Sequence, residues 1–191
     1  MARTPTPLAA ARRVDAERNR ARIVDAARAA FADPDADVSM AEISRRAGVG
    51  SATLYRNFAN RRELLEALYV DEIDAVCQAA ATISGDSPQA ILVAWLRRFY
   101  AYFESKRFVA AALLEHADRD APVFGAGLAR VLNASRPLLR AAQESGEIRT
   151  DLTLEQILDM VAAIAKIPGD AGYREPILRA ALDALRQAKD G

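Results

Sequence analysis

Residues 39–62 read SMAEISRRAGVGSATLYRNFANRR, and this stretch decides the fold. Its opening serine is followed three positions later by glutamate, the capping-box pattern, so we expect a helix to begin at Met40. The Gly-Val-Gly sequence at 48–50 should end that helix, because glycine accepts the positive φ that a tight turn requires. Another short helix is expected from Ser51 to Phe58. Two short capped helices joined by a glycine turn form a helix-turn-helix candidate.

The second of these helices is expected to have two different faces. Leu54 and Phe58 lie four residues apart and should face inward. The opposite face is polar, and the major groove of DNA is wide enough to accept such a helix. Arg56 has the chemistry to bind a guanine and Asn57 the edge of an adenine, although Arg56 is also compatible with a solvated surface charge. The outward-facing residues are Ser51, Thr53, Tyr55, Arg56 and Asn57.

This stretch resembles the DNA-binding signature of the tetracycline-repressor (TetR) family of transcriptional regulators. The resemblance covers about residues 16–68. Ala59 is a departure, because many members carry lysine there and a possible phosphate contact is lost. The matching pattern is Ile43-x4-Gly48-Val49-x4-Leu54-Tyr55-x2-Phe58-x-Asn60-Arg61-x2-Leu64-Leu65.

The resemblance implies a role for each residue of the motif. Thr53 and Tyr55 would contact phosphates, and Arg61 would lie at the DNA backbone beside the next helix. Packing between helices is the alternative for Tyr55. Independently of the family, Ser39 places a hydroxyl and free amides at a helix N-terminus, where phosphate can bind, or it only caps the helix. The residues implied to face the bases are Ser51, Ala52, Arg56 and Asn57.

Charge is divided unevenly along the chain. The formal net charge is zero, yet residues 1–62 hold 12 Lys+Arg and 7 Asp+Glu, a net of 12 − 7 = +5. Residues 63–191 hold 14 and 19, a net of 14 − 19 = −5. We therefore expect a basic tail and DNA-binding domain over 1–62 and a regulatory, dimerising domain over 63–191. The tail arginines, which are Arg3, Arg12 and Arg13, either grip phosphate without sequence preference or only solubilise the chain.

The fold class expected is all-α, with an N-terminal three-helix helix-turn-helix domain and a C-terminal helical domain for dimerisation and ligand binding. Pro137 should bend or break the helix that contains it. A second capping box, from Thr153 to Gln156, should start another helix. Besides the two helices of the motif, the expected ranges are about 16–32, 61–85, 88–105, 108–116, 122–143, 154–167 and 175–188.

The last two expected helices carry broad apolar faces. They are compatible with a core within one chain or with an interface to a second copy. The resemblance implies the second, a homodimer with a four-helix interface. Two-fold symmetry presents two recognition helices, so the DNA partner would be a palindromic operator.

An aromatic stripe marks the middle of the chain. Trp95, Phe99 and Phe103 are four residues apart, which is typical either of helix core or of a cavity lined by rings. The family resemblance implies an effector pocket, with His116 as a possible polar anchor. The candidate ligand-binding residues are Trp95, Phe99, Tyr102, Phe103, Phe108, His116 and Phe124.

The inventory of reactive residues argues against an enzyme. One histidine, one cysteine and the lack of a glycine-rich phosphate loop leave no cofactor or metal site to expect. The lone Cys77 fits a reducing cytoplasm, and neither a secretory signal nor a membrane span is expected. The function expected is a DNA-binding repressor released by a small molecule, although an activator would use the same parts. A helical effector-binding or protein-interaction module without specific DNA binding is the alternative.

Overall fold

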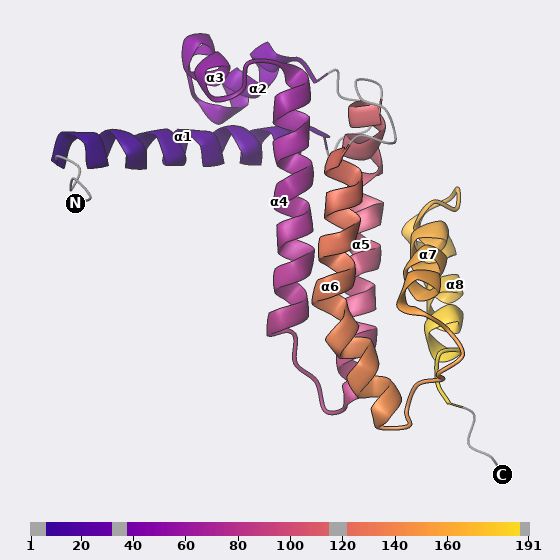
Figure 1. The fold of residues 1–191 in the computed structure, drawn as a ribbon. Coiled ribbons are helices and arrows are strands. Elements are labelled where there is room, and N and C mark those ends of the chain that lie inside the picture. Colours follow the sequence, from indigo (N-terminus) through magenta and orange to yellow (C-terminus); the bar gives the residue numbers. More distant parts are fainter. Residues whose placement is uncertain (1–6, 32–37, 115–121, 188–191) are drawn as a thin grey trace. The chain divides into compact units, whose positions relative to one another are not determined.

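A computed structural model describes the backbone of residues 7–31, 38–114 and 122–187, and their side chains except at 7–13, 104–114 and 122–124. Within these ranges the chain is helical and has no strand beyond one isolated bridge between Ile148 and Arg186, which confirms the all-α class. The helices are α1 (Pro7–Phe31), α2 (Met40–Ala47), α3 (Ser51–Asn57), α4 (Arg61–Thr82), α5 (Pro88–Leu114), α6 (Pro122–Glu144), α7 (Leu154–Ala165) and α8 (Ala171–Asp183) (Figure 1).

The chain divides into two compact units, and the division falls inside α4. The first unit comprises Met1–Tyr69 with Phe108–Asp118, and the second comprises Val70–Arg107 with Arg119–Gly191. The functional boundary expected between residues 62 and 63 stays a prediction. None of the described helices is both long enough and apolar enough to cross a bilayer.

The first unit is built on α1, which packs against α2 and α3. Ile23, Ala27 and Ala30 are fully buried, in agreement with the apolar face expected there. The helix begins at Pro7, nine residues before the expected start at 16, with proline at the first helical position that it favours. An apolar stripe predicts the packed part of a helix but not how far the helix extends beyond it.

The two capping boxes expected from the sequence have different outcomes. At α7, Thr153 Oγ1 accepts from Gln156 N (3.3 Å) and Gln156 Oε1 accepts from Thr153 N (2.9 Å), which confirms that box. At α2, Ser39 Oγ accepts from Glu42 N (3.2 Å), so the cap is confirmed. The Glu42 carboxylate is bound instead by two arginines of its own helix, so the reciprocal half of this box was wrong.

Two places where the sequence suggested an interruption lie inside continuous helices. α5 runs unbroken through residues 105–108, because this segment contains neither glycine nor proline and ordinary polar residues continue a helix. α6 likewise continues past Pro137, so this proline does not break the helix, while the bend that was the other expectation stays a prediction. Pro137 and Asn133, whose carbonyl loses its partner, are both exposed to solvent, where water can satisfy that carbonyl.

The last helix was placed too late in the sequence. α8 begins at Ala171 rather than 175, because Asp170 caps it by accepting from Tyr173 N (2.8 Å). After α8, Arg149 N donates to Leu185 O and Gln187 N to Glu147 O, each at 3.0 Å, so bridge pairing replaces the expected last turn. The core of α7 and α8 is closed by Ile157, Leu158, Val161, Leu178, Leu182 and Leu185.

Candidate nucleic-acid interface

The turn between α2 and α3 is fixed by backbone geometry and hydrogen bonds. Gly48 has φ +61° and ψ +38°, the left-handed conformation that favours glycine. Gly48 N donates to Arg45 O and Val49 N to Ser44 O, both at 3.1 Å. Ser44 is buried and its hydroxyl donates to Val49 O at 2.7 Å. These bonds set the direction in which α3 leaves the turn.

The inner face of α3 is anchored as expected. Leu54 and Phe58 are both fully buried, as are Ile23 of α1 and Ile43 of α2. This burial leaves the short helix one orientation within the first unit, because rotation about its axis would expose both apolar side chains.

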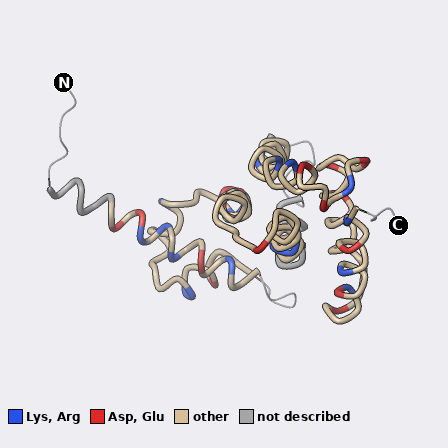
Figure 2. Tube along the Cα trace, turned by 90° about the horizontal axis from the view of Figure 1, so that it is seen from below, with Lys and Arg blue, Asp and Glu red and all other residues tan. Residues whose placement is uncertain are grey.

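The outer face of α3 is open to solvent, in agreement with its predicted polarity. Ser51, Ala52, Tyr55 and Arg56 are exposed, whereas Thr53 and Asn57 are half-buried. Tyr55 is 53% exposed, which is unusual for a large aromatic side chain and does not fit the alternative of packing between helices. Charges of both signs lie along the first unit (Figure 2).

Two residues expected to read bases are engaged within α3 itself. Arg56 Nη2 donates to Thr53 Oγ1 (2.9 Å), and Asn57 Nδ2 donates to Thr53 O (2.8 Å). Arg56 is exposed and can swing away from Thr53, but Asn57 would have to give up a helix-end hydrogen bond to reach a base. The structure therefore makes Arg56 the better placed of the two.

Ser39 and Arg61 lie on either side of the motif. Ser39 is exposed and its oxygen caps α2, which leaves its hydroxyl proton free to donate. Arg61 is half-buried, bonds Val38 O through Nη1, and lies 5.0 Å from the centre of the Phe31 ring. Arg61 thus joins α4 to the chain before α2, a structural contact that sequence reasoning did not find.

The exposed arginines of α2 were also missed. Glu42 Oε1 accepts from Arg45 Nη2 (2.6 Å) and Arg46 Nε (2.7 Å), and these two bonds lower the pKa of Glu42 from 4.5 to about 2. The signal is visible in the sequence, because arginines three and four positions after a glutamate are neighbours on a helix.

The aromatic candidates of the second unit form one cluster. Trp95 stacks on Phe99 with ring centres 5.5 Å apart, and Phe103 meets Phe99 edge-on at 4.9 Å. Tyr102 meets Phe103 at 5.2 Å. Trp95 is fully buried and its Nε1 donates to Val76 O (3.2 Å). His116 lies outside the described residues, as do the side chains of Phe108 and Phe124.

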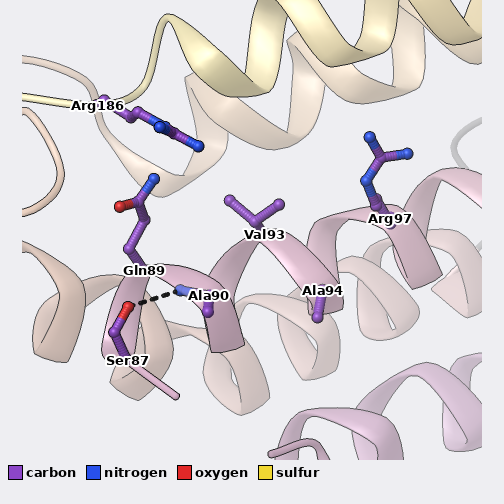
Figure 3. Close-up of a pocket in the computed structure, with 7 residues that line it drawn as sticks. All are labelled: Ser87, Gln89, Ala90, Val93, Ala94, Arg97 and Arg186. Carbon is purple, nitrogen blue, oxygen red and sulfur yellow. Dashed lines mark hydrogen bonds between the residues drawn. The ribbon is translucent and has the colours of Figure 1, made fainter. Parts of the chain in front are cut away.

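Two surface hollows of the second unit lie away from this cluster. The first is about 370 Å³ and lies along α5, between Arg97 and Arg186 (Figure 3). The second is about 400 Å³ and is lined from α4 and α5. Neither is lined by the aromatic candidates. The first is lined by Ser87, Gln89, Ala90, Val93, Ala94, Arg97 and Arg186, and the second by Ala75, Gln78, Ala79, Thr82, Ile83 and Arg98.

Over the described ranges, no group of three or more His, Cys, Asp or Glu side chains is arranged to hold a metal ion. The geometry is that of a helix-turn-helix unit with an anchored inner face, an exposed outer face and an all-helical second unit. That combination defines a class of two-part DNA-binding regulators.

Comparison with known proteins identifies the family. The model of bacterial regulatory proteins of the TetR family matches residues 23–68, and that of the SbtR-like transcriptional regulator C-terminal domain matches residues 87–187. No protein of curated function matches the chain. The chain belongs to the TetR family of transcriptional regulators.

Solved structures agree over nearly the whole chain. A TetR transcriptional regulator from Streptomyces coelicolor is 32% identical with a TM-score of 0.72, covering 88% of this chain and 99% of that one. A TetR regulatory protein from Mycobacterium vanbaalenii is 29% identical with a TM-score of 0.72, covering 91% and 98%. RolR, solved with its ligand resorcinol, is 23% identical with a TM-score of 0.57, covering 90% and 89%, and shows the fold alone.

Proposed function

We propose that this protein binds a specific palindromic operator as a homodimer and represses transcription until a small-molecule effector releases it. The observation that carries the proposal is the division of α3, whose Leu54 and Phe58 are fully buried while Ser51, Tyr55 and Arg56 are exposed. A helix held in this way can enter the major groove with its polar side. Residues 1–62 form the DNA-binding part and 63–191 the regulatory part, and the protein acts on DNA in the cytoplasm rather than as an enzyme.

The interface residues have three roles in this proposal. Arg56 reads a base and Asn57 does so only after releasing Thr53 O, with Ser51 and Ala52 close to the bases. Thr53 and Tyr55 contact phosphates, as the resemblance to the family implies; Tyr55 is exposed and Thr53 lies at the border of the exposed face. Ser39, at the N-terminus of α2, donates its hydroxyl proton to another phosphate, and Arg61 supports the DNA backbone beside α4.

The homodimer is supported by an apolar strip that α8 leaves exposed. Tyr173 is 61% exposed, and Pro176, Ala180 and Ala184 follow on the same side at helical spacing. Small side chains allow a second helix to approach closely. A two-fold interface here would present two copies of α3 to successive turns of the duplex.

The effector proposal rests on the aromatic cluster and on a fold-level comparison. RolR, of the same fold, has resorcinol as its ligand. Trp95, Phe99, Tyr102 and Phe103 supply rings against which an aromatic molecule could stack, and His116 and Phe124 remain candidates for the same site. A ligand that binds one dimer conformation more tightly than the other weakens DNA binding by that difference in affinity.

Selection of bound duplexes from a random DNA pool tests the DNA-binding proposal. We expect an inverted repeat with half-site centres about one helical turn apart, or a multiple of that spacing. Arg140→Ala removes one exposed arginine from α6 and serves as the control, since it should select the same site. Failure of the native protein to enrich any duplex at low salt would refute the proposal and leave a helical module without specific DNA binding.

Tryptophan emission tests the effector proposal, because Trp95 is the only tryptophan in the chain and lies within the cluster. With resorcinol as the first probe and other small phenols after it, we expect saturable quenching together with release of the selected duplex. Quenching without release of the duplex would mean that binding at the cluster is not coupled to DNA binding. Release with unchanged emission would place the effector site outside this cluster.

A further inference from the structure

Two arginines of α1 contact the C-terminal ends of both helices of the motif. Arg22 Nη2 donates to Gly48 O (3.2 Å), at the end of α2, and Arg20 Nη1 donates to Asn57 O (3.4 Å), at the end of α3. The carbonyls at a helix C-terminus carry a partial negative charge, so a guanidinium group there is favourable. Neither arginine belongs to the helix-turn-helix sequence pattern.

Arg22 completes the hydrogen bonding of the turn. The three successive carbonyls of residues 48–50 are bonded by three different helices: Gly48 O by Arg22 of α1, Val49 O by Ser44 of α2, and Gly50 O by amides of α3. A Cβ at residue 48 would lie 2.7 Å from Arg22 Nη2. The guanidinium thus occupies the space that glycine leaves open.

Arg20 makes a second contact at the other end of α3. Its guanidinium carbon lies 4.4 Å from the centre of the Phe58 ring, which is fully buried. A cation over an aromatic face is attracted by the ring, in addition to the bond to Asn57 O. Arg22 immediately precedes the buried pair Ile23 and Val24, and Arg20 lies two residues before Arg22, so both start close to a packed part of α1.

We propose that Arg20 and Arg22 are positioning residues that hold α3 at the angle at which it enters the DNA groove. This inference rests on the proposed function, because the angle matters only if α3 reads DNA. The competing explanation is that both arginines contact phosphates directly. The two roles differ in their salt dependence, since a phosphate contact releases counterions and an internal hydrogen bond does not.

The test compares Arg20→Gln and Arg22→Gln with Arg18→Gln. Arg18 lies on the same helix, is exposed, and forms an ion pair with Asp15 at 3.7 Å, so the control removes the same charge without touching α2 or α3. Each protein is titrated with the selected duplex and with a random duplex over a range of salt concentrations. Circular dichroism verifies that each variant remains helical.

The positioning role predicts a loss confined to the selected duplex. We expect Arg20→Gln and Arg22→Gln to bind it roughly tenfold or more weakly than Arg18→Gln does, with random-duplex affinities within about twofold and the same salt slope. Equal losses on both duplexes with a shallower salt slope would show a phosphate contact and overturn the inference. Undiminished binding of the selected duplex would overturn it as well.

Hydrogen exchange of the DNA-free protein provides an independent measurement. In Arg20→Gln and Arg22→Gln, the amides of α3 should exchange roughly tenfold faster than in Arg18→Gln, with α7 unchanged. Unchanged α3 exchange overturns the positioning role even if the native protein binds DNA. A native protein that selects no duplex instead overturns the proposed function, so the two failures are distinct.

Discussion

The α2–α3 pair and the α4–α8 part of the chain both bury large apolar side chains, but the burial has a different effect in each region. In α3, burial of Leu54 and Phe58 leaves a polar face with one available direction. In α7, Leu154, Ile157, Leu158 and Val161 are buried to hold the second unit together. In the first region the buried core orients an exposed functional face, and in the second it stabilises a helical scaffold. The function can therefore be recognised from a short sequence motif only in the first region.

Because of this difference, mutations of the same kind should have different consequences in the two regions. A change on the outer face of α3 should alter DNA recognition while the fold survives. A change in α7 or α8 should first alter the fold, unless it falls on the exposed strip from Tyr173 to Ala184. Pairs of variants, one at a buried residue and one at an exposed residue nearby, separate an effect on the fold from an effect on an interface.

The largest effect is expected for Leu182→Glu. Leu182 is 2% exposed within a single chain, so the variant buries a carboxylate that has no place in the core. We expect a loss of at least about 3 kcal/mol in the free energy of unfolding, measured with urea. Because Leu182 is buried within a single chain, unfolding is expected before any effect on an interface between two copies.

Ala180→Glu is the matched variant two residues away. Ala180 is exposed, so the monomer should keep its stability while the proposed dimer dissociates and loses its operator. Sedimentation measures the oligomeric state of both proteins. A dimeric Ala180→Glu protein with full DNA affinity would remove the α8 strip from the interface.

Local signals explain how much of the fold could be predicted from sequence. The caps at Ser39 and Thr153 and the turn at Gly48 depend on neighbours within five residues, and the structure has each of them. The unbroken α5 was missed because no local signal distinguishes a polar helix interior from a loop. The early start of α8 was missed because its N-cap, Asp170, comes before a helix that has Pro176 inside it, where proline is normally disfavoured.

The site was predictable only in part, for a related reason. Exposure of Tyr55 and Arg56 follows from helical period and was expected. The contacts from Arg20 to Asn57 and from Arg22 to Gly48 join residues 37 and 26 positions apart, and no periodicity encodes them. The aromatic stripe of α5 predicted neighbours correctly, but whether rings enclose a ligand depends on how several helices pack.

Arg56→Ala is the next largest effect, and it acts on DNA binding alone. Losing a bidentate base contact should cost about 1–3 kcal/mol and relax selectivity at one base pair of each half-site. Tyr55→Phe removes only a hydroxyl from a side chain that is 53% exposed and should weaken all duplexes alike. Binding measured on a panel of single-base variants separates the two. Equal selectivity in native and Arg56→Ala proteins would remove Arg56 from the base-reading set.

Gly48→Ala tests the turn that orients α3. A left-handed alanine costs roughly 1–2 kcal/mol, and its Cβ would also displace Arg22. Gly50→Ala is the control, since Gly50 has φ −70° and open space around its Cα. There the weaker N-cap and the stiffer unfolded chain oppose each other, and the net change should be about 0.5 kcal/mol or less. Thermal unfolding of both variants checks this, and equal losses would show that conformation at residue 48 is unimportant.

The smallest effect expected is the pH dependence contributed by Glu42, the one carboxylate among the arginines of residues 39–62. Bonds from Arg45 and Arg46 lower its pKa from 4.5 to about 2 in the folded protein. A lowered pKa means that the ionised form favours folding, so the stabilisation is complete above pH 4.5 and disappears as pH falls towards 2.

Because the side chains of Glu42, Arg45 and Arg46 are on the surface, the change in melting temperature should be small and should shrink with added salt. Glu42→Gln should lower the melting temperature slightly at neutral pH, where the ion pairs are lost, and should flatten its pH profile between pH 4.5 and about 2. A Glu42→Gln profile as steep as that of the native protein would mean that the acid sensitivity arises from carboxylates outside the motif.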